Sequence, residues 1–127
     1  MKTSLALIAL SALAVALPVS AQEARPAAVV IMNLGHSFTP AEITVPVGAT
    51  VEWRNRAFFH HTATFDPAKA GDPAHVRLPA GVAPFDSSKI GGGKSWSHRF
   101  TTPGRYRYVC LPHEDHGMIG VVNVTGG

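Results

Sequence analysis

The chain has one cysteine, Cys110, among 127 residues. A protein that depends on disulfides needs an even number, so the sequence excludes a disulfide-stapled scaffold. Charged residues make up only 15% of the chain, the formal net charge is +3, and no run of Lys or Arg occurs. This balance argues against a nucleic-acid-binding protein. The 46% hydrophobic content argues equally against a disordered chain.

Only one long apolar run is present, and it lies at the N-terminus. Lys2 precedes the apolar segment Leu5–Leu17, which is followed by Val19-Ser20-Ala21. A basic start, an apolar centre and small residues before a cleavage point are typical of an export signal. We predict a signal peptide over 1–21, cleaved to leave a single domain over 22–127 in the periplasm. No other apolar run approaches the roughly 20 residues of a transmembrane helix, so the mature protein is not expected to span a membrane.

Short strand patterns separated by turn residues dominate the rest of the chain. Polar and apolar residues alternate in Thr50–Trp53, in Ser95–Phe100 and in Arg105–Val109. Several short strands with Pro and Gly turns between them predict an all-β sandwich or barrel. The further strand candidates are Ala28–Leu34, Ile43–Val45, Thr62–Phe65 and Gly120–Thr125.

The segment 66–94 breaks this pattern. It contains four Pro and five Gly, so it cannot form a continuous helix or a central strand. We predict a long Pro/Gly-rich loop, with a short helical turn near Val76–Leu78. A loop of this length in a small domain is commonly functional or mobile, and the sequence leaves its role open.

Three side chains able to bind a metal stand close together near the C-terminus. Cys110, His113 and Met118 form the pattern C-x2-H-x4-M between two predicted strands. A thiolate and a thioether with two imidazoles form the ligand set of a blue-copper electron-transfer centre, so this pattern favours copper and needs one more histidine. Zinc more often binds several Cys or His and has little use for a thioether. The alternatives are a buried structural thiol and a methionine that fills the core.

At these residues the sequence resembles the cupredoxins, meaning the plastocyanin, amicyanin and pseudoazurin group. The resemblance covers nearly the whole of 22–127 and implies a cupredoxin-like Greek-key β-sandwich that binds one type 1 copper ion. The motifs that carry it are F-x-P-x-x-I-x-V-x-x-G at Phe38–Gly48, W-x-N-x5-H at Trp53–His61, F-D-S at Phe85–Ser87, P-G-x-Y-x-Y-x-C at Pro103–Cys110, and G-M-x-G-x-V-x-V at Gly117–Val124.

The resemblance implies that His61, Cys110, His113 and Met118 are the copper ligands. The spacing within the tryptophan motif selects His61 over its neighbour His60, which is expected at the rim of the site. Because His60 is adjacent to His61 in the sequence, it is the competing candidate for the second imidazole ligand.

The resemblance also implies how the ligands are supported. The backbone N–H of Thr62 is expected to donate to the sulfur of Cys110, while Pro112 has no N–H to add a second donor. Thr62 departs from the Asn common at this position. The imidazole edge of His113 is expected to face solvent and to serve as the electron port.

We therefore expect a soluble, monomeric one-electron carrier and not an enzyme, because four protein ligands leave no open position for a substrate. Expected partners are larger redox proteins, such as cytochrome c or a copper or quinoprotein enzyme. The main alternative is a periplasmic copper carrier or resistance protein that binds and delivers copper. The histidines His36, His60 and His116 favour it, since they could form a second metal site or a docking face.

His75 is interpreted as an ordinary loop histidine. Arg105 and Arg107 alternate with tyrosines and are predicted to face solvent, where they could form a basic patch toward an acidic partner. The sequence also leaves open an accessory subunit of a redox enzyme, and a domain whose metal serves only stability.

Overall fold

The computed structural model describes residues 6, 8, 9, 11–14 and 25–127. Most of the predicted signal peptide over 1–21, with its cleavage point, lies outside the described residues. No helix in the described part is long and apolar enough to cross a membrane. The described elements are β1 (Ala28–Met32), β2 (Phe38–Thr39), β3 (Glu42–Pro46), β4 (Thr50–Asn55), β5 (Thr64–Phe65), the 3-10 helix η1 (Pro73–His75), β6 (Phe85–Asp86), β7 (Ser95–Arg99), β8 (Gly104–Val109), the 3-10 helix η2 (Leu111–His116) and β9 (Ile119–Thr125).

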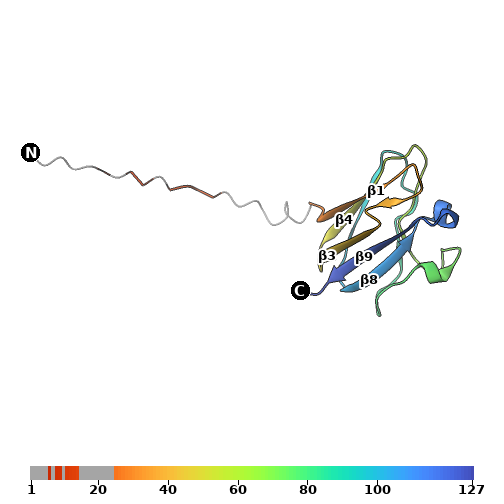
Figure 1. The fold of residues 1–127 in the computed structure, drawn as a ribbon. Coiled ribbons are helices and arrows are strands. Elements are labelled where there is room, and N and C mark those ends of the chain that lie inside the picture. The colour runs from red at the N-terminus through yellow and green to blue at the C-terminus, as the bar shows by residue number, and fades with distance from the viewer. Residues whose placement is uncertain (1–5, 7, 10, 15–24) are drawn as a thin grey trace, which may run out of the picture.

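The strands form two sheets, ordered β2-β1-β4-β7 and β3-β9-β8-β5-β6 (Figure 1). The pairs β1–β4 and β3–β9 are parallel, and the other pairs are antiparallel. The two sheets confirm the predicted all-β sandwich. Both 3-10 helices lie at the same end of the molecule, where η1 comes beside η2 (Figure 1).

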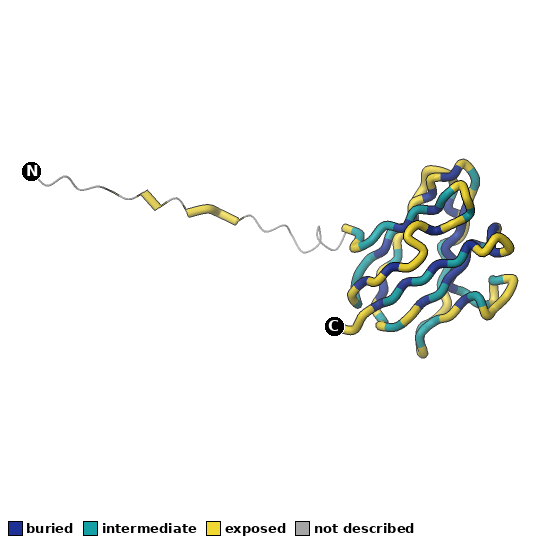
Figure 2. The backbone as a smooth tube through the Cα atoms, viewed as in Figure 1, coloured by how far each residue is buried: buried dark blue, intermediate teal, exposed yellow. Residues whose placement is uncertain are grey.

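Alternation of polar and apolar residues places the core between the sheets. In β4, Val51 and Trp53 are buried while Glu52 and Arg54 are not, as expected for a strand with one face turned inward. Figure 2 shows buried and less buried positions alternating along the strands. Aromatic rings fill much of the core, and Phe65 and Tyr108 stack with their centroids 4.6 Å apart.

All seven predicted strands are present, with shifts of one or two residues at their ends. The sequence patterns missed β2 and β6, because a two-residue strand is too short to show an alternation. The helical turn predicted near Val76–Leu78 is also misplaced. It lies at Pro73–His75, where the side chain of Asp72 caps it by accepting from the N–H of Ala74 at 2.9 Å.

One buried hydrogen bond ties the two sheets together. The indole N–H of Trp53 in β4 donates to the hydroxyl of Tyr108 in β8 at 3.0 Å, and both residues are fully buried. Burial raises the pKa of Tyr108, so its hydroxyl stays neutral. Because no water reaches this pair, each partner depends on the other to satisfy its polar atom.

We predict that Tyr108→Phe lowers the free energy of unfolding by about 1–3 kcal/mol, because it leaves the indole N–H of Trp53 buried without an acceptor. The matched control is Tyr106→Phe. The hydroxyl of Tyr106 donates to the carbonyl of Thr102 in a part-buried position, where water can replace it, so a smaller loss is expected. Chemical denaturation of both variants measures the difference, and equal losses would contradict the inter-sheet role of Tyr108.

Candidate metal centre

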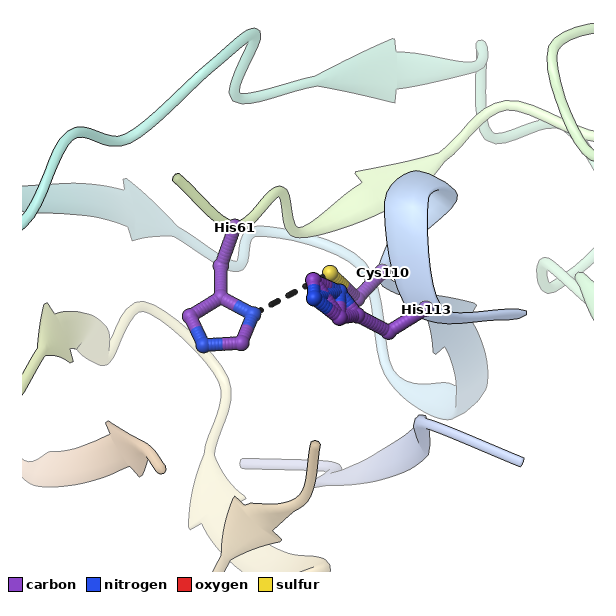
Figure 3. Close-up of side chains that lie close together, drawn as sticks. All are labelled: His61, Cys110 and His113. Carbon is purple, nitrogen blue, oxygen red and sulfur yellow. Dashed lines mark hydrogen bonds between the residues drawn. The ribbon is translucent and has the colours of Figure 1, made fainter. Parts of the chain in front are cut away.

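Three predicted ligands meet at one end of the sandwich. His61 precedes β5, Cys110 follows β8, and His113 lies in η2. One donor atom from each lies within 4.8 Å of the other two, and the Nδ1 of His61 is 3.4 Å from the Sγ of Cys110 (Figure 3). His61 and Cys110 are fully buried, and His113 is 9% exposed. The three side chains thus form a pocket of nitrogen and sulfur donors shielded from water.

The loop after Cys110 is short and folds back on itself. Pro112 starts the turn of η2, and Gly117 ends it with a φ of 74°, a left-handed conformation that glycine adopts without strain. The N–H of Cys110 then donates to the carbonyl of Met118 at 3.0 Å, and the N–H of Met118 donates to the carbonyl of His113 at 3.3 Å. Met118 is 1% exposed and packs in the core cluster that also contains Cys110. The loop therefore brings the backbone of Met118 beside that of Cys110, and both side chains are buried.

His61 is held by contacts that set the direction of its ring. Its Nε2 lies 3.1 Å from the carbonyl oxygen of Asn33, and its backbone exchanges two hydrogen bonds with Ile90. A carbonyl accepts only, so Nε2 carries the proton and donates. Nδ1, which faces Cys110, is therefore the nitrogen free to bind a metal.

Asn55, at the end of β4, organises the loops beside His61. Its side-chain amide donates to the carbonyls of Phe59 and Ile90, each at 2.8 Å, and its side-chain oxygen accepts from the N–H of Ala57 at 2.8 Å. Because Asn55 is 2% exposed, these bonds satisfy the polar atoms that burial would otherwise penalise. They fix the backbone that precedes His61 and the segment at Ile90 that pairs with His61.

The expected donor to the cysteine sulfur is confirmed. The N–H of Thr62 lies 3.4 Å from the Sγ of Cys110. The Thr62 hydroxyl accepts from the N–H of Leu111 at 2.9 Å, and it lies 2.8 Å from the hydroxyl of Thr64, which donates to Asp86 at 2.7 Å. Since the Thr64 proton is used on the carboxylate, Thr62 donates to Thr64. This chain of hydrogen bonds joins the ligand loop to β5 and β6. It is built on Thr62, at the position where the resemblance led us to expect an asparagine.

Burial disfavours the charged forms of the three donor groups. Burial raises the pKa of the Cys110 thiol and lowers the pKa of His61. It also lowers the pKa of His113 to about 4, with the nearby His36 and His61 adding to the effect. The Nδ1 of His113 is buried and has no hydrogen-bond partner within the described residues. A neutral imidazole nitrogen without a partner, beside a thiol and a second imidazole, fits a bound metal ion.

Two rings cover the imidazole of His113. The ring centroid of His36 lies 4.0 Å from that of His113, and the ring of Phe59 stacks against it at 5.1 Å. His116 stacks in turn on His36 at 4.8 Å. His113 is 9% exposed, and the rings of His36 and Phe59 lie against it. His60 is exposed at the rim, as expected.

Sequence reasoning missed Glu114, which fastens the ligand loop to the segment 66–94. Its carboxylate accepts from the N–H of Gly71 at 2.8 Å, from the N–H of Asp72 at 3.1 Å and from the Nδ1 of His75 at 2.8 Å. Burial opposes the charge, but these donors outweigh it and lower the pKa of Glu114. His75, interpreted from the sequence as an ordinary loop histidine, thus makes a structural contact with the ligand loop. No sequence signal links the two residues, because they lie 39 positions apart in two short 3-10 helices.

We predict that Glu114→Gln lowers the free energy of unfolding of the metal-free protein by about 2 kcal/mol, since hydrogen bonds to a charged group are lost and donors stay buried. Amide hydrogen exchange should also speed up in η2 and around Asp72. The matched control is Asp115→Asn, which removes a carboxylate from the next, exposed position. If both variants exchange alike, the anchoring role of Glu114 is wrong.

A comparison with protein families matches residues 27–125 to the copper binding proteins of the plastocyanin/azurin family. The chain therefore belongs to this family. The buried thiol and two imidazoles are a donor set suited to one copper ion, in agreement with that assignment.

Two curated relatives are plastocyanins. The protein of Tetradesmus obliquus is 36% identical over 87 residues, which cover 68% of this chain and 57% of the relative. The protein of Scenedesmus fuscus is 34% identical over 87 residues, which cover 68% of this chain and 85% of the relative. The chain thus spans little more than half of the first relative and most of the second.

Solved structures confirm the cupredoxin fold. A Cu(I) form of an amicyanin mutant superposes with a TM-score of 0.63 at 31% identity, covering 84% of this chain and 89% of amicyanin. The copper-containing nitrite reductase of Thermus scotoductus gives a TM-score of 0.62 at 32% identity, covering 80% of this chain but only 22% of the enzyme. The same fold therefore also occurs as a part of an enzyme.

Proposed function

We propose that the chain is a type 1 (blue) copper protein that carries single electrons between larger redox proteins. The observation that carries this proposal is the buried cluster of His61, Cys110 and His113 in the fold of amicyanin and in a family that contains plastocyanin. We propose Met118 as the fourth ligand, because it is buried at the base of the same loop. Copper held there supplies a one-electron Cu(II)/Cu(I) couple.

The residues around the sulfur tune this couple. Cys110 binds as a thiolate, so it must lose the proton that burial favours in the metal-free protein. The backbone N–H groups of Thr62 and His113 favour the charged form of the sulfur, whereas Pro112 has no N–H to add. Fewer hydrogen bonds to a thiolate leave more of its charge on the metal, which affects the reduction potential.

The supports described above limit how far the ligands can move. His61 is fixed through Asn33 and Asn55, and the ligand loop through Thr62 and Glu114. A site whose ligands stay in place between two oxidation states rearranges little when an electron arrives. With four protein ligands no coordination position is open to a substrate, so we propose a carrier and not an enzyme.

Two exposed apolar side chains lie in the segments whose rings contact His113. Phe58 is 85% exposed, and its ring lies 5.1 Å from that of Phe59, which itself stacks on His113. Leu34, two residues before His36, is 55% exposed. Exposed apolar side chains beside a covered imidazole suit brief contact with a redox protein, and we propose a cytochrome c or a copper or quinoprotein enzyme as partner.

We also propose that the domain over 22–127 is a monomer that acts in the periplasm after removal of 1–21. The support is the leader pattern in the sequence. In addition, Ile8 and Leu13 are 84% and 88% exposed, so these apolar side chains do not pack against the domain.

We predict that one equivalent of Cu(II) gives the mature protein an intense visible band from thiolate-to-copper charge transfer. Cys110→Ser should abolish the band because it removes the sulfur, and His61→Ala should abolish or strongly change it. His60→Ala is the matched control and should keep it. A band that survives His61→Ala but not His60→Ala would overturn the ligand set.

A weakly coloured protein that still binds copper tightly would reject the blue-copper function and favour a copper carrier. The two functions also differ in kinetics. An electron carrier exchanges electrons quickly between its oxidised and reduced forms and keeps its metal, whereas a carrier of copper transfers the metal to an acceptor. Self-exchange rates and copper loss to a chelator measure this difference directly.

We predict that Met118→Leu raises the reduction potential, because an apolar side chain replaces a sulfur donor that stabilises Cu(II). The matched control is Met32→Leu, which makes the same change at a fully buried methionine in β1 and should leave the potential unchanged. Electrochemistry on both proteins tests this. Equal potentials in the two variants would show that Met118 only fills the core.

A further inference from the structure

We propose that a groove on the outer face of the five-stranded sheet receives an acidic surface of a protein partner. The groove has a volume of about 630 Å³. Its basic side chains are Arg77, Arg105 and Arg107, and its apolar lining is Leu78, Ile119 and Val121. We call these six residues the arginine groove. That the partner is a redox protein rests on the proposed function, whereas the binding of an acidic surface does not.

Backbone hydrogen bonds place Arg77 opposite Arg107. The N–H of Arg77 donates to the carbonyl of Arg107 at 3.0 Å, and the N–H of Arg107 donates to the carbonyl of Arg77 at 2.9 Å. Residues that exchange both bonds in an antiparallel pair lie directly opposite each other, with side chains on one face. Arg105 is two positions earlier in β8, so it shares that face.

Most of this positive charge has no counter-charge in the protein. Arg105 pairs with Glu42 at 2.6 Å on an exposed surface. Arg77 and Arg107 form no ion pair with any residue in the described part of the chain. Like charges directly opposite each other in a sheet destabilise it. The repulsion between Arg77 and Arg107 is thus unfavourable for the stability of the fold, and an external anion would relieve it.

The chemistry of the groove selects carboxylates on a protein. A guanidinium presents a planar fork of N–H donors that matches a carboxylate with two parallel hydrogen bonds. The lining of Leu78, Ile119 and Val121 is only half-buried, so it offers apolar contact between the charges. A recessed site with an apolar lining suits protruding acidic side chains better than a flat array of lipid headgroups.

The position of the groove connects it with the metal centre. Cys110 is three positions after Arg107, just beyond the end of β8, which corresponds to about 10 Å of extended chain. Ile119, in the lining, directly follows Met118. A partner seated in the arginine groove would lie over the strand that carries the cysteine, away from the rings that cover His113.

The test is a titration of the uniformly ¹⁵N-labelled, purified protein with hexaglutamate at low salt, followed by amide chemical shifts. We expect saturable shifts centred on Arg77 and Arg107, and none with hexalysine. Arg77→Gln and Arg107→Gln should each weaken binding about threefold or more, and salt should abolish it. Arg56→Gln, which removes one exposed charge beyond β4, is the matched control and should bind like the parent.

Three results would overturn the proposal. The first is the absence of saturable shifts at the groove. The second is binding of phosphatidylglycerol vesicles through the same arginines with no binding of hexaglutamate, which would assign the groove to a membrane surface. The third is a lower free energy of unfolding in Arg107→Gln, which would make Arg107 a structural residue, whereas relief of repulsion predicts equal or higher stability. Because none of these measurements needs copper, failure here is separable from failure of the blue-copper function.

Discussion

The close approach of three buried donor atoms is the constraint around which the rest of this structure is arranged. His61, Cys110 and His113 bring two nitrogens and a sulfur within 4.8 Å of one another at the end of a sandwich. Buried polar groups are costly unless they find partners, and the Nδ1 of His113 has none among the described residues. The site is therefore incomplete as a set of protein atoms, and a metal ion is the partner that its chemistry fits.

Such a cluster can be kept in place only if the polar groups behind it are satisfied. Asn55 uses all its side-chain hydrogen-bonding groups on the loops next to His61, and Thr62 both accepts and donates within its chain of hydrogen bonds. Glu114 accepts three hydrogen bonds from the segment 66–94. Fully satisfied buried networks make a structure rigid, whereas half-satisfied ones loosen it. The Pro/Gly-rich segment thus has a structural task at the metal centre.

Sequence reasoning succeeded where the information is local. Alternation within single strands was enough to predict the strands, and the spacing from Cys110 to His113 was enough to predict that a thiol and an imidazole meet, because both lie in one short loop. The contact between Glu114 and His75 and the covering of His113 by His36 could not be foreseen. Each joins a short 3-10 helix to a segment far away in the chain, where no periodicity indicates which residues meet.

The net charge of the whole chain likewise does not predict where charged side chains gather on the surface. A net charge of +3 over 127 residues predicts no strong preference for a partner. The fold nevertheless gathers Arg77, Arg105 and Arg107 on one sheet face and leaves Phe58, beside the ring that contacts His113, exposed. A carrier must release each partner after one electron, so small contact areas with high selectivity are an advantage. Charge can steer one partner to the arginine groove, while apolar contact can serve a second partner near His113. Electrostatic complementarity acts more on association and specificity than on the strength of the final complex.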